Sequence, residues 1–225
     1  IEIVNDDMPF LVDSVTMELN RRNLTVHLVI HPTFAVQRNG EGKAKTFKSV
    51  SDGANGAVRE SLMHVQIGEQ TSPEALKKIE RGILKVLNDV RAAVNDWRPM
   101  LQQVEESISE LSKAPAGLDQ EEVDEAIAFL QWAHDDRFTF LGYRQFKLVG
   151  RGAKAKVEIV PKSGMGVLRN SRVLVFEGLG DASRISPVVE AFLRQPQPLR
   201  VTKGNLRSTI HRPVHLDTFG VKQFN

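Results

Sequence analysis

The chain has 225 residues, of which 41% are hydrophobic and 26% are charged, with a net charge of +2 and no cysteine. This composition predicts a globular protein with real hydrophobic cores, enough for one large or two small domains, and makes disorder an unlikely default. Without cysteine the chain has no disulfides, thiolate metal sites or cysteine nucleophiles, which fits a reducing cytoplasm, and no apolar run approaches the roughly 20 residues of a membrane span.

A charged, proline-containing turn joins the first predicted strand to the first predicted helix. Ile1, Ile3 and Val4 predict a short strand, and Asp6 or Asp7 is expected to cap the helix that follows. The helix is expected from apolar residues at helical spacing: Met8, Leu11, Val12, Val15 and Leu19. The turn between strand and helix is therefore the first candidate for a ligand-facing element.

The next segments predict strands and a loop. Leu24 to Val36 is rich in β-branched and aromatic residues and predicts one long strand. Asn39 to Gly56 predicts a loop, with at most a short strand over Thr46 to Val50. Alternating apolar residues from Met63 to Ile67 predict a further strand.

A long amphipathic helix is expected next. Thr71 and Glu74 form a predicted capping box, with Pro73 in the first turn. Its apolar stripe comprises Leu76, Ile79, Ile83, Val86, Leu87, Val90, Val94 and Trp97. Beyond an expected kink at Pro99 the helical pattern continues through Leu101, Val104, Ile108 and Leu111.

The order strand, helix, strand, strand, helix predicts an α+β fold that begins with a ferredoxin-like module over residues 1–98, the fold of the ACT modules that bind amino acids. The fourth strand of that fold is missing, because a helical pattern stands in its place. An ACT ligand site usually has glycine after the proline of its turn, whereas Phe10 occupies that position here.

A helical linker is expected over residues 99–136, and a mainly antiparallel α+β module over 137–225. Asp119 and Glu122 form a second predicted capping box in the linker, after a break at Ala114 to Gly117. The second module has a short predicted helix capped by Ser186, with Pro187 at its first position. Its predicted strands are Phe138 to Val149, Val157 to Val160, Val167 to Phe176, Leu199 to Lys203 and Thr209 to Phe224.

Charge is divided unevenly along the chain. Residues 1–136 hold 14 basic and 23 acidic residues, a charge of −9, whereas residues 137–225 hold 16 and 5, a charge of +11. This contrast favours two modules, whose opposite potentials would attract each other or other parts of a larger protein. It also leaves open an alternative function, an anion- or nucleic-acid-binding module in the basic half. Nucleic acid is the less favoured ligand, because the aromatic residues there alternate like core residues and no recognition motif is present.

Three segments resemble a known family. NDDMPFLVDSV (5–15), DRFTFLGYRQFKL (136–148) and LRVTKGNLRSTIHRPVHLDTFGVKQF (199–224) are similar to the N-terminal region of the large bacterial NAD-specific glutamate dehydrogenases. The resemblance implies ACT-like modules, a second module of PAS-like type, and a catalytic domain with its NAD site far downstream. The start at Ile1 and the end within a strand-like run also suggest a piece of a longer protein.

That resemblance implies a regulatory or assembly role within the whole enzyme, which deaminates glutamate oxidatively to 2-oxoglutarate and ammonia with NAD. In this part of the chain we expect no catalytic, cofactor-binding or metal-binding residues. The expected partners are the remainder of the polypeptide, other subunits in a homo-oligomer, and an amino-acid effector.

Two groups of residues are candidate binding sites. The first is the turn, where backbone N–H groups could meet an effector's carboxylate: Asn5, Asp6, Asp7, Met8, Pro9, Phe10 and Leu11. A purely structural turn is the simpler interpretation, because Asp6 and Asp7 as helix caps explain these residues without catalysis. The second is a polar cluster for an anion or an interdomain carboxylate, or else a solvated basic hairpin: Lys203, Asn205, Arg207, His211 and Arg212.

Two glycine-rich runs and two histidine pairs give only weak support for a nucleotide or metal site. GRGAKA (150–155) lies between two predicted strands, and GLGDAS (178–183) has serine where a dinucleotide loop has its third glycine. The pairs His27 with His31 and His211 with His215 would each share one strand face, but neither has a third metal ligand nearby in the sequence. We therefore expect no nucleotide or metal site in these segments.

Overall fold

A computed structural model describes residues 1–50, 56–113, 117–149, 156–173, 191–193 and 195–223. The fold is α+β, and the chain divides into two compact units. The first comprises Ile1–Val90 and Thr209–Arg212, and the second comprises Arg91–Ser208 and Pro213–Asn225. Domain boundaries at residues 98 and 136 stay a prediction. Every helix in the described ranges is too short or too polar to cross a membrane.

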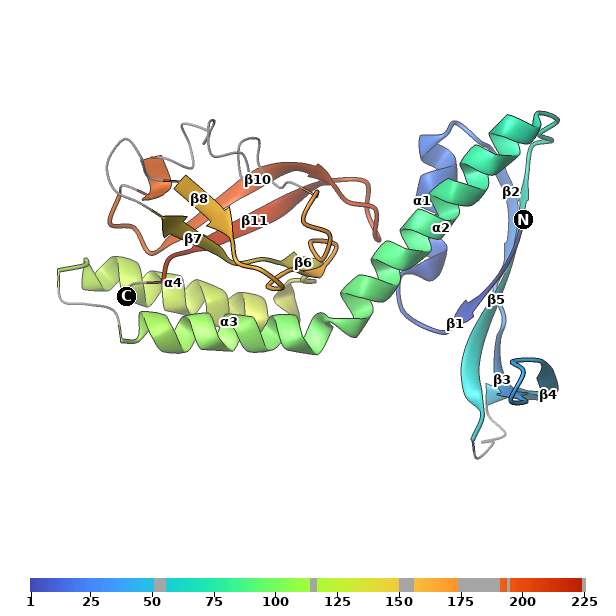
Figure 1. Ribbon diagram of the computed structural model, residues 1–225, viewed down its shortest axis with the longest axis horizontal. Helices are drawn as coiled ribbons and strands as arrows, with labels where there is room; N and C mark the ends of the chain where they lie inside the picture. The colour runs from blue at the N-terminus through green and yellow to red at the C-terminus, as the bar shows by residue number, and fades with distance from the viewer. Residues whose placement is uncertain (51–55, 114–116, 150–155, 174–190, 194, 224–225) are drawn as a thin grey trace. The chain divides into compact units, whose positions relative to one another are not determined.

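The first unit is a five-stranded antiparallel sheet with helices (Figure 1). Its elements in chain order are β1 (Glu2–Asp6), α1 (Leu11–Arg21), β2 (Val26–Ile30), β3 (Thr33–Arg38), β4 (Ala44–Ser49), β5 (Val58–Ile67) and the larger part of α2 (Pro73–Asn95). The predicted order of strands and helices is therefore confirmed, with an added hairpin at β4.

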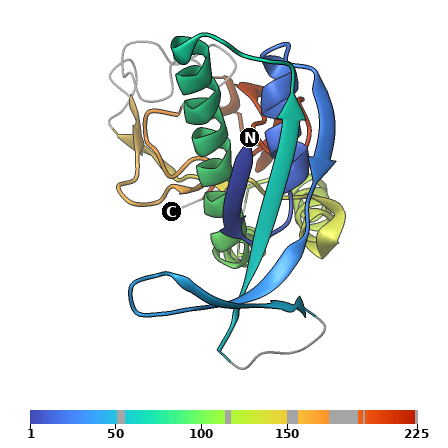
Figure 2. The same ribbon diagram turned by 90° about the vertical axis from the view of Figure 1, so that its right-hand side faces the viewer.

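Strand β5 is the centre of this sheet, between β1 on one edge and β2 with β3 on the other (Figure 2). Ser61 of β5 pairs with Asn5 of β1 and with Thr33 of β3. Strand β2 pairs farther along the same edge of β5, so β2 and β3 follow each other along it. The prediction of one long strand over Leu24 to Val36 is wrong at the break between them, where Pro32 has no N–H for a ladder.

The core of the first unit lies between the sheet and the two helices, which cover the same face in Figure 1. In β1, Ile3 and Asn5 are buried while Val4 is exposed, because successive strand residues point to opposite faces. The helices supply most of the remaining buried apolar side chains: Leu11, Val15, Leu19, Ile79, Ile83, Val86, Leu87 and Val90. This confirms most of the predicted apolar stripes, but Leu76 and Trp97 are exposed, and Trp97 lies beyond the end of α2.

Helix α2 begins at Pro73 as predicted, but its cap is Ser72 rather than Thr71. The Ser72 hydroxyl accepts a hydrogen bond from the Ala75 N–H at 3.3 Å and donates one to the Glu74 carboxylate at 2.9 Å. Hydrogen bonds from the backbone of Glu74 and from Ser72 hold the pKa of Glu74 below its usual value. The capping motif is therefore displaced by one residue from the predicted box.

The helical pattern expected around Pro99 is interrupted slightly earlier. Helix α2 ends at Asn95, and Asp96 precedes α3 (Trp97–Leu111), which places Pro99 in the first turn of the new helix. Proline is tolerated there because first-turn N–H groups have no partner within the helix. Within the described part of the first unit no strand follows α2, so the missing fourth ferredoxin-like strand is confirmed.

In the described residues, the second unit joins the helices α3 and α4 to small antiparallel sheets. Its further elements are α4 (Gln120–Trp132), a π-helical turn (Ala133–Arg137), β6 (Gly142–Tyr143), β7 (Phe146–Val149), β8 (Lys156–Ile159), β9 (Met165–Gly166), β10 (Leu199–Arg207) and β11 (His215–Val221). The strands pair as β10 with β11, β6 with β9 and β7 with β8. Asp119 caps α4 as predicted, since its carboxylate accepts the Glu121 N–H at 3.0 Å.

Helices α3 and α4 contribute to the core of the second unit. Val104, Leu111, Ala126 and Leu130 form a buried cluster, against which Phe140, Leu199 and Val221 pack. The region expected to be a linker therefore packs directly on β10 and β11.

Three strand predictions in the second unit need correction. The run Phe138 to Val149 holds two short strands, β6 and β7, and residues 167–173 form turns rather than a strand. The strand expected from Thr209 begins only at His215, because residues 209–212 pack in the first unit. The predicted caps Ser186 and Pro187, the GRGAKA run and the GLGDAS run lie outside the described residues.

Candidate functional site

The turn between β1 and α1 is fixed at Asp7 by the neighbouring strand. The Asp7 N–H donates to the Arg59 carbonyl at 2.9 Å, and its carboxylate lies 3.0 Å from the Arg59 guanidinium. Asp6 is the last residue of β1. The prediction that Asp6 or Asp7 caps α1 is therefore wrong: the helix begins only at Leu11, its N-cap residue is Phe10, and no side chain caps it.

Phe10 stands at the N-cap position of α1 in a left-handed conformation, with φ of 71° and ψ of 2°. Its carbonyl accepts the first helical hydrogen bond, from the Ser14 N–H at 3.1 Å. Left-handed backbone suits glycine and is uncommon for a bulky side chain. Phe10 thus adopts a backbone conformation that favours glycine, at the position where an ACT turn is expected to have glycine.

Segment Thr209–Arg212, called the clasp below, packs on the helices of the first unit. Ile210 is only 1% exposed and belongs to the buried core residues. The His211 N–H donates to the Ser14 hydroxyl at 3.1 Å, and Nδ1 of His211 lies 3.0 Å from the Asp13 carboxylate. The His211 ring also contacts the Phe10 ring, with 5.4 Å between centroids.

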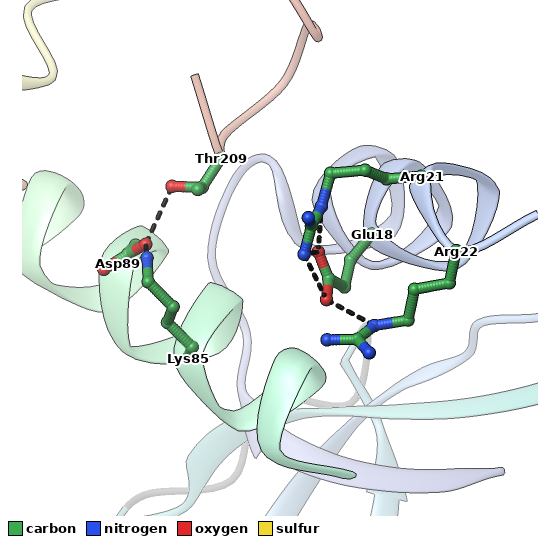
Figure 3. A network of polar contacts seen from close by, with 6 residues as sticks. All are labelled: Glu18, Arg21, Arg22, Lys85, Asp89 and Thr209. Carbon is green, nitrogen blue, oxygen red and sulfur yellow. Dashed lines mark hydrogen bonds and ion pairs between the residues drawn. The ribbon is translucent and has the colours of Figure 1, made fainter. Parts of the chain in front are cut away.

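The other end of the clasp is held by α2. The Thr209 hydroxyl donates to the Asp89 carboxylate at 2.8 Å, and the same carboxylate pairs with the Lys85 ammonium at 2.5 Å (Figure 3). The clasp therefore has a polar anchor on each helix and one buried apolar side chain.

A second polar group in the first unit was not expected from the sequence. Glu18 of α1 is almost fully buried and pairs with Arg21 and Arg22 at 2.7 Å each (Figure 3). A Cβ added to Gly82 of α2 would lie 2.1 Å from the Glu18 carboxylate. Gly82 is the signal that the sequence offered, because a glycine inside a helical stripe often marks a close approach by another element.

Of the predicted polar cluster, only His211 reaches the β1–α1 turn. Lys203 pairs with Asp217 across the β10–β11 hairpin at 2.6 Å, and Arg207 donates to His215 at 3.3 Å. Asn205 and Arg212 are exposed. The five residues were expected to act together, but Lys203, Asn205 and Arg207 belong to the second unit and His211 with Arg212 to the first.

Three of the four histidines in the two predicted pairs make separate hydrogen bonds. His31 lies in the break after β2 and contacts the Ser61 hydroxyl, while His27 is exposed on β2. His215 Nδ1 contacts the Gly204 carbonyl at 3.1 Å, away from the clasp contacts of His211. Across the described residues no group of three or more potential metal-binding side chains is found.

Two further buried charges stabilise the second unit and were also missed. The Asp96 carboxylate accepts the Gly166 N–H at 2.7 Å and pairs with Arg169 at 2.5 Å. The buried Arg144 guanidinium donates to three carbonyls, those of Leu168, Asn170 and Val173. Burial lowers the pKa of Arg144. These contacts hold the irregular segment after β9 in place.

The arrangement in the first unit defines a class of protein: an α+β domain of ACT type, with helices on one face of an antiparallel sheet. Residues 1–83 match the family described as the ACT1 domain of glutamate dehydrogenase. The class is thus supported by the sequence family as well as by the order of the strands.

Curated relatives extend the comparison to the whole chain. It is 34% identical to the NAD-specific glutamate dehydrogenase of Halomonas elongata and 33% identical to that of Pseudomonas aeruginosa, in each case over 226 aligned residues that cover 100% of this chain and 14% of the relative. The enzyme of Mycobacterium tuberculosis is 28% identical over 173 residues, covering 75% of this chain and 10% of the relative. The chain corresponds to the N-terminal region, with its ACT1 domain, of the large NAD-specific glutamate dehydrogenases, as the three segments predicted.

Proposed function

We propose that this chain is a non-catalytic regulatory and assembly region of a large, cytoplasmic NAD-dependent glutamate dehydrogenase. The observation that carries the proposal is the ACT1 match over residues 1–83, in a chain that spans only 14% of its first two relatives. The whole enzyme would deaminate L-glutamate oxidatively to 2-oxoglutarate and ammonia, with the NAD site and the catalytic residues elsewhere in the polypeptide.

The proposed effector site is the turn from Asn5 to Leu11. Two features support it: the turn is anchored at Asp7 by Arg59, and the His211 side chain contacts both the Phe10 ring and the Asp13 carboxylate, so one imidazole meets an aromatic ring and a carboxylate. An aromatic face and a carboxylate together suit the ammonium group of an amino acid. An effector regulates only if it binds one state of the enzyme better than another.

The assembly role is proposed for the same region, with other subunits of a homo-oligomer and the rest of the polypeptide as partners. The second unit, with its small antiparallel sheets, is proposed to be a PAS-like module.

The test is deletion of residues 1–225 from the full-length enzyme. We expect altered oligomeric state or altered response to amino acids, measured by light scattering and by initial rates with and without each amino acid. A full-length Asp13→Asn variant, which removes one exposed charge at nearly constant side-chain size, should lose the amino-acid response alone. Unchanged assembly, kinetics and stability in the deletion variant would refute the proposal.

The alternative, an anion- or nucleic-acid-binding role for residues 137–225, rests on their charge of +11. Retention of the chain on immobilised nucleic acid that falls steeply with salt would favour this alternative. Absence of retention at low salt would dismiss it.

A further inference from the structure

The clasp combines two features that rarely occur together in a surface loop, a fully buried side chain and a left-handed backbone. Ile210 is 1% exposed, whereas Val214, only four residues later, is 52% exposed. His211 has φ of 64°, and the Arg212 N–H donates to the Ile210 carbonyl at 2.7 Å, which closes a three-residue turn around His211. The burial of Ile210 and the bonds to Ser14, Asp13 and Asp89 hold this turn in place.

The partner of this turn on α1 is also left-handed. Phe10 has φ of 71°, and its ring lies against the His211 ring. A left-handed backbone conformation is unfavourable for a non-glycine residue and persists only where surrounding contacts fix it. Residues in such conformations are concentrated at ligand sites and switches. Here two such residues, far apart in sequence, face each other at the proposed effector turn.

We propose that Thr209–Arg212 is a releasable clasp that occupies the effector position at Phe10 and Asp13, so that clasp docking and effector binding exclude each other. The clasp rests on its own contacts, whereas the identity of the competing ligand, an amino acid, rests on the proposed function. Because a carboxylate only accepts hydrogen bonds, Nδ1 of His211 donates to Asp13, beside the Phe10 ring. The α-ammonium of an amino acid offers the same kind of donor to the same two groups.

Release would have a consequence beyond the turn itself. The residues on either side of the clasp, Ser208 and Pro213, belong to the second unit, and the chain continues directly into β10 and β11. An effector that displaces His211 therefore frees a segment that is covalently continuous with the second unit.

The first experiment measures whether the clasp is docked. Because the natural chain has no cysteine, single variants report cleanly on one position. We compare the rate of maleimide labelling of the folded 225-residue chain carrying Ile210→Cys with that of the matched control variant Val214→Cys. Docking predicts labelling of Ile210→Cys that is slower by about 10-fold or more, since only the open fraction reacts. Adding His211→Ala should raise that rate towards the control value, while far-UV circular dichroism stays unchanged.

Equal labelling rates for Ile210→Cys and Val214→Cys would overturn the proposal, provided the Ile210→Cys chain keeps its circular dichroism. Because the Ile210→Cys substitution could itself loosen the clasp, amide hydrogen exchange of the unsubstituted chain provides a second measurement. Protection of the His211 amide, which donates to Ser14, is the expected result. Exchange of that amide at the rate of an open loop would overturn docking independently.

The second experiment tests competition, with L-glutamate, L-aspartate and L-leucine titrated calorimetrically into the whole chain. If the clasp leaves the effector position open in about 1 to 10% of molecules, His211→Ala should bind the amino acid about 10- to 100-fold more tightly. Asp13→Asn should lose binding and Val214→Ala should leave it unchanged. The amino acid should also speed the labelling of Ile210→Cys.

The outcomes separate this inference from the proposed function. Equal affinity of the wild type and His211→Ala, or slower labelling of Ile210→Cys with the ligand bound, would overturn the competition and leave the effector role intact. No binding by any of these chains would overturn both the competition and the effector role, while the deletion experiment would still test assembly.

Discussion

Replacement of Gly82 by alanine tests how closely α1 and α2 pack. In an open helix this change would stabilise the chain by roughly 1 kcal/mol, because alanine is the better helix former. Here the new Cβ would lie 2.1 Å from Oε1 of Glu18 and 2.4 Å from Nη2 of Arg22. Both are ends of long side chains, but the Glu18 side chain is only 4% exposed and has little room to move.

The expected result is a loss of stability despite the gain in helix propensity. Overpacking a core site costs about 1–3 kcal/mol, and breaking a buried ion pair costs about 3–5 kcal/mol. Arg22 is the more exposed partner and moves aside, so we expect the pair to shift without being lost. Subtraction of the propensity gain of roughly 1 kcal/mol from the overpacking cost leaves a net destabilisation of up to about 2 kcal/mol.

The assay is urea unfolding followed by far-UV circular dichroism, with amide exchange of α1 as the local reporter. Both tryptophans, Trp97 and Trp132, lie in the second unit, so their fluorescence would not follow this change. Gly40→Ala is the matched control, because a Cβ there meets nothing within 4 Å, and it should stay within about 0.5 kcal/mol of the wild type.

A double-mutant cycle identifies the cause. If Glu18 is the obstacle, the double variant of Glu18→Ala and Gly82→Ala should be less destabilised than the sum of the single variants. A Gly82→Ala chain that is as stable as the wild type, or more stable, would show that helix propensity dominates. It would refute the close approach of α1 to α2 at this residue.

Three further predictions concern a pH dependence, a cap and a buried carboxylate. Hydrogen bonds from Arg38 lower the pKa of Glu60 below its usual 4.5, so this pair should stabilise the chain above pH 4.5 and lose that effect as pH falls through the lowered pKa. The difference in unfolding free energy between the wild type and Arg38→Gln, measured by urea unfolding, should therefore shrink at acidic pH. A difference that stays constant with pH would contradict this prediction. Ser72→Ala should cost about 1 kcal/mol and Thr71→Ala close to nothing in thermal unfolding, whereas the reverse order would restore the predicted capping box. Asp96→Asn should destabilise the second unit by about 1.5–3 kcal/mol, since it weakens charged hydrogen bonds to Gly166 and Arg169; unchanged tryptophan-monitored unfolding would count against these contacts.

Local sequence patterns determined the elements of the first unit. Apolar residues at a period of 3.6 located α1 and α2, and β-branched runs located most of its strands. Pro73 marked the start of α2, because proline fits the first position of a helix. The family resemblance was also a property of the sequence alone, and the comparisons confirmed it.

The sequence-based predictions were wrong where the local sequence allowed more than one cap or element boundary. Thr71 and Ser72 are both good caps, and the choice depends on where the backbone turns before Pro73. Asp6 and Asp7 precede a helix as caps do, yet the ladder with β5 extends to Asp6 and Arg59 binds Asp7, so the helix starts later. In the second unit short strands with little periodicity were merged into longer ones.

Only the tertiary structure revealed the clasp and the buried charges. Ile210 is as apolar as a strand residue would be, so the predicted strand was continued through residues 209–212, although Pro213 argued for a break. Their placement beside Phe10 and Asp13 depends on contacts across nearly 200 positions of sequence, such as that between His211 and Asp13. Sequence periodicity shows which face of a helix or strand is buried, but not which distant segment covers that face. The proposed effector site depends on the identity of the covering segment, which only the tertiary structure gives.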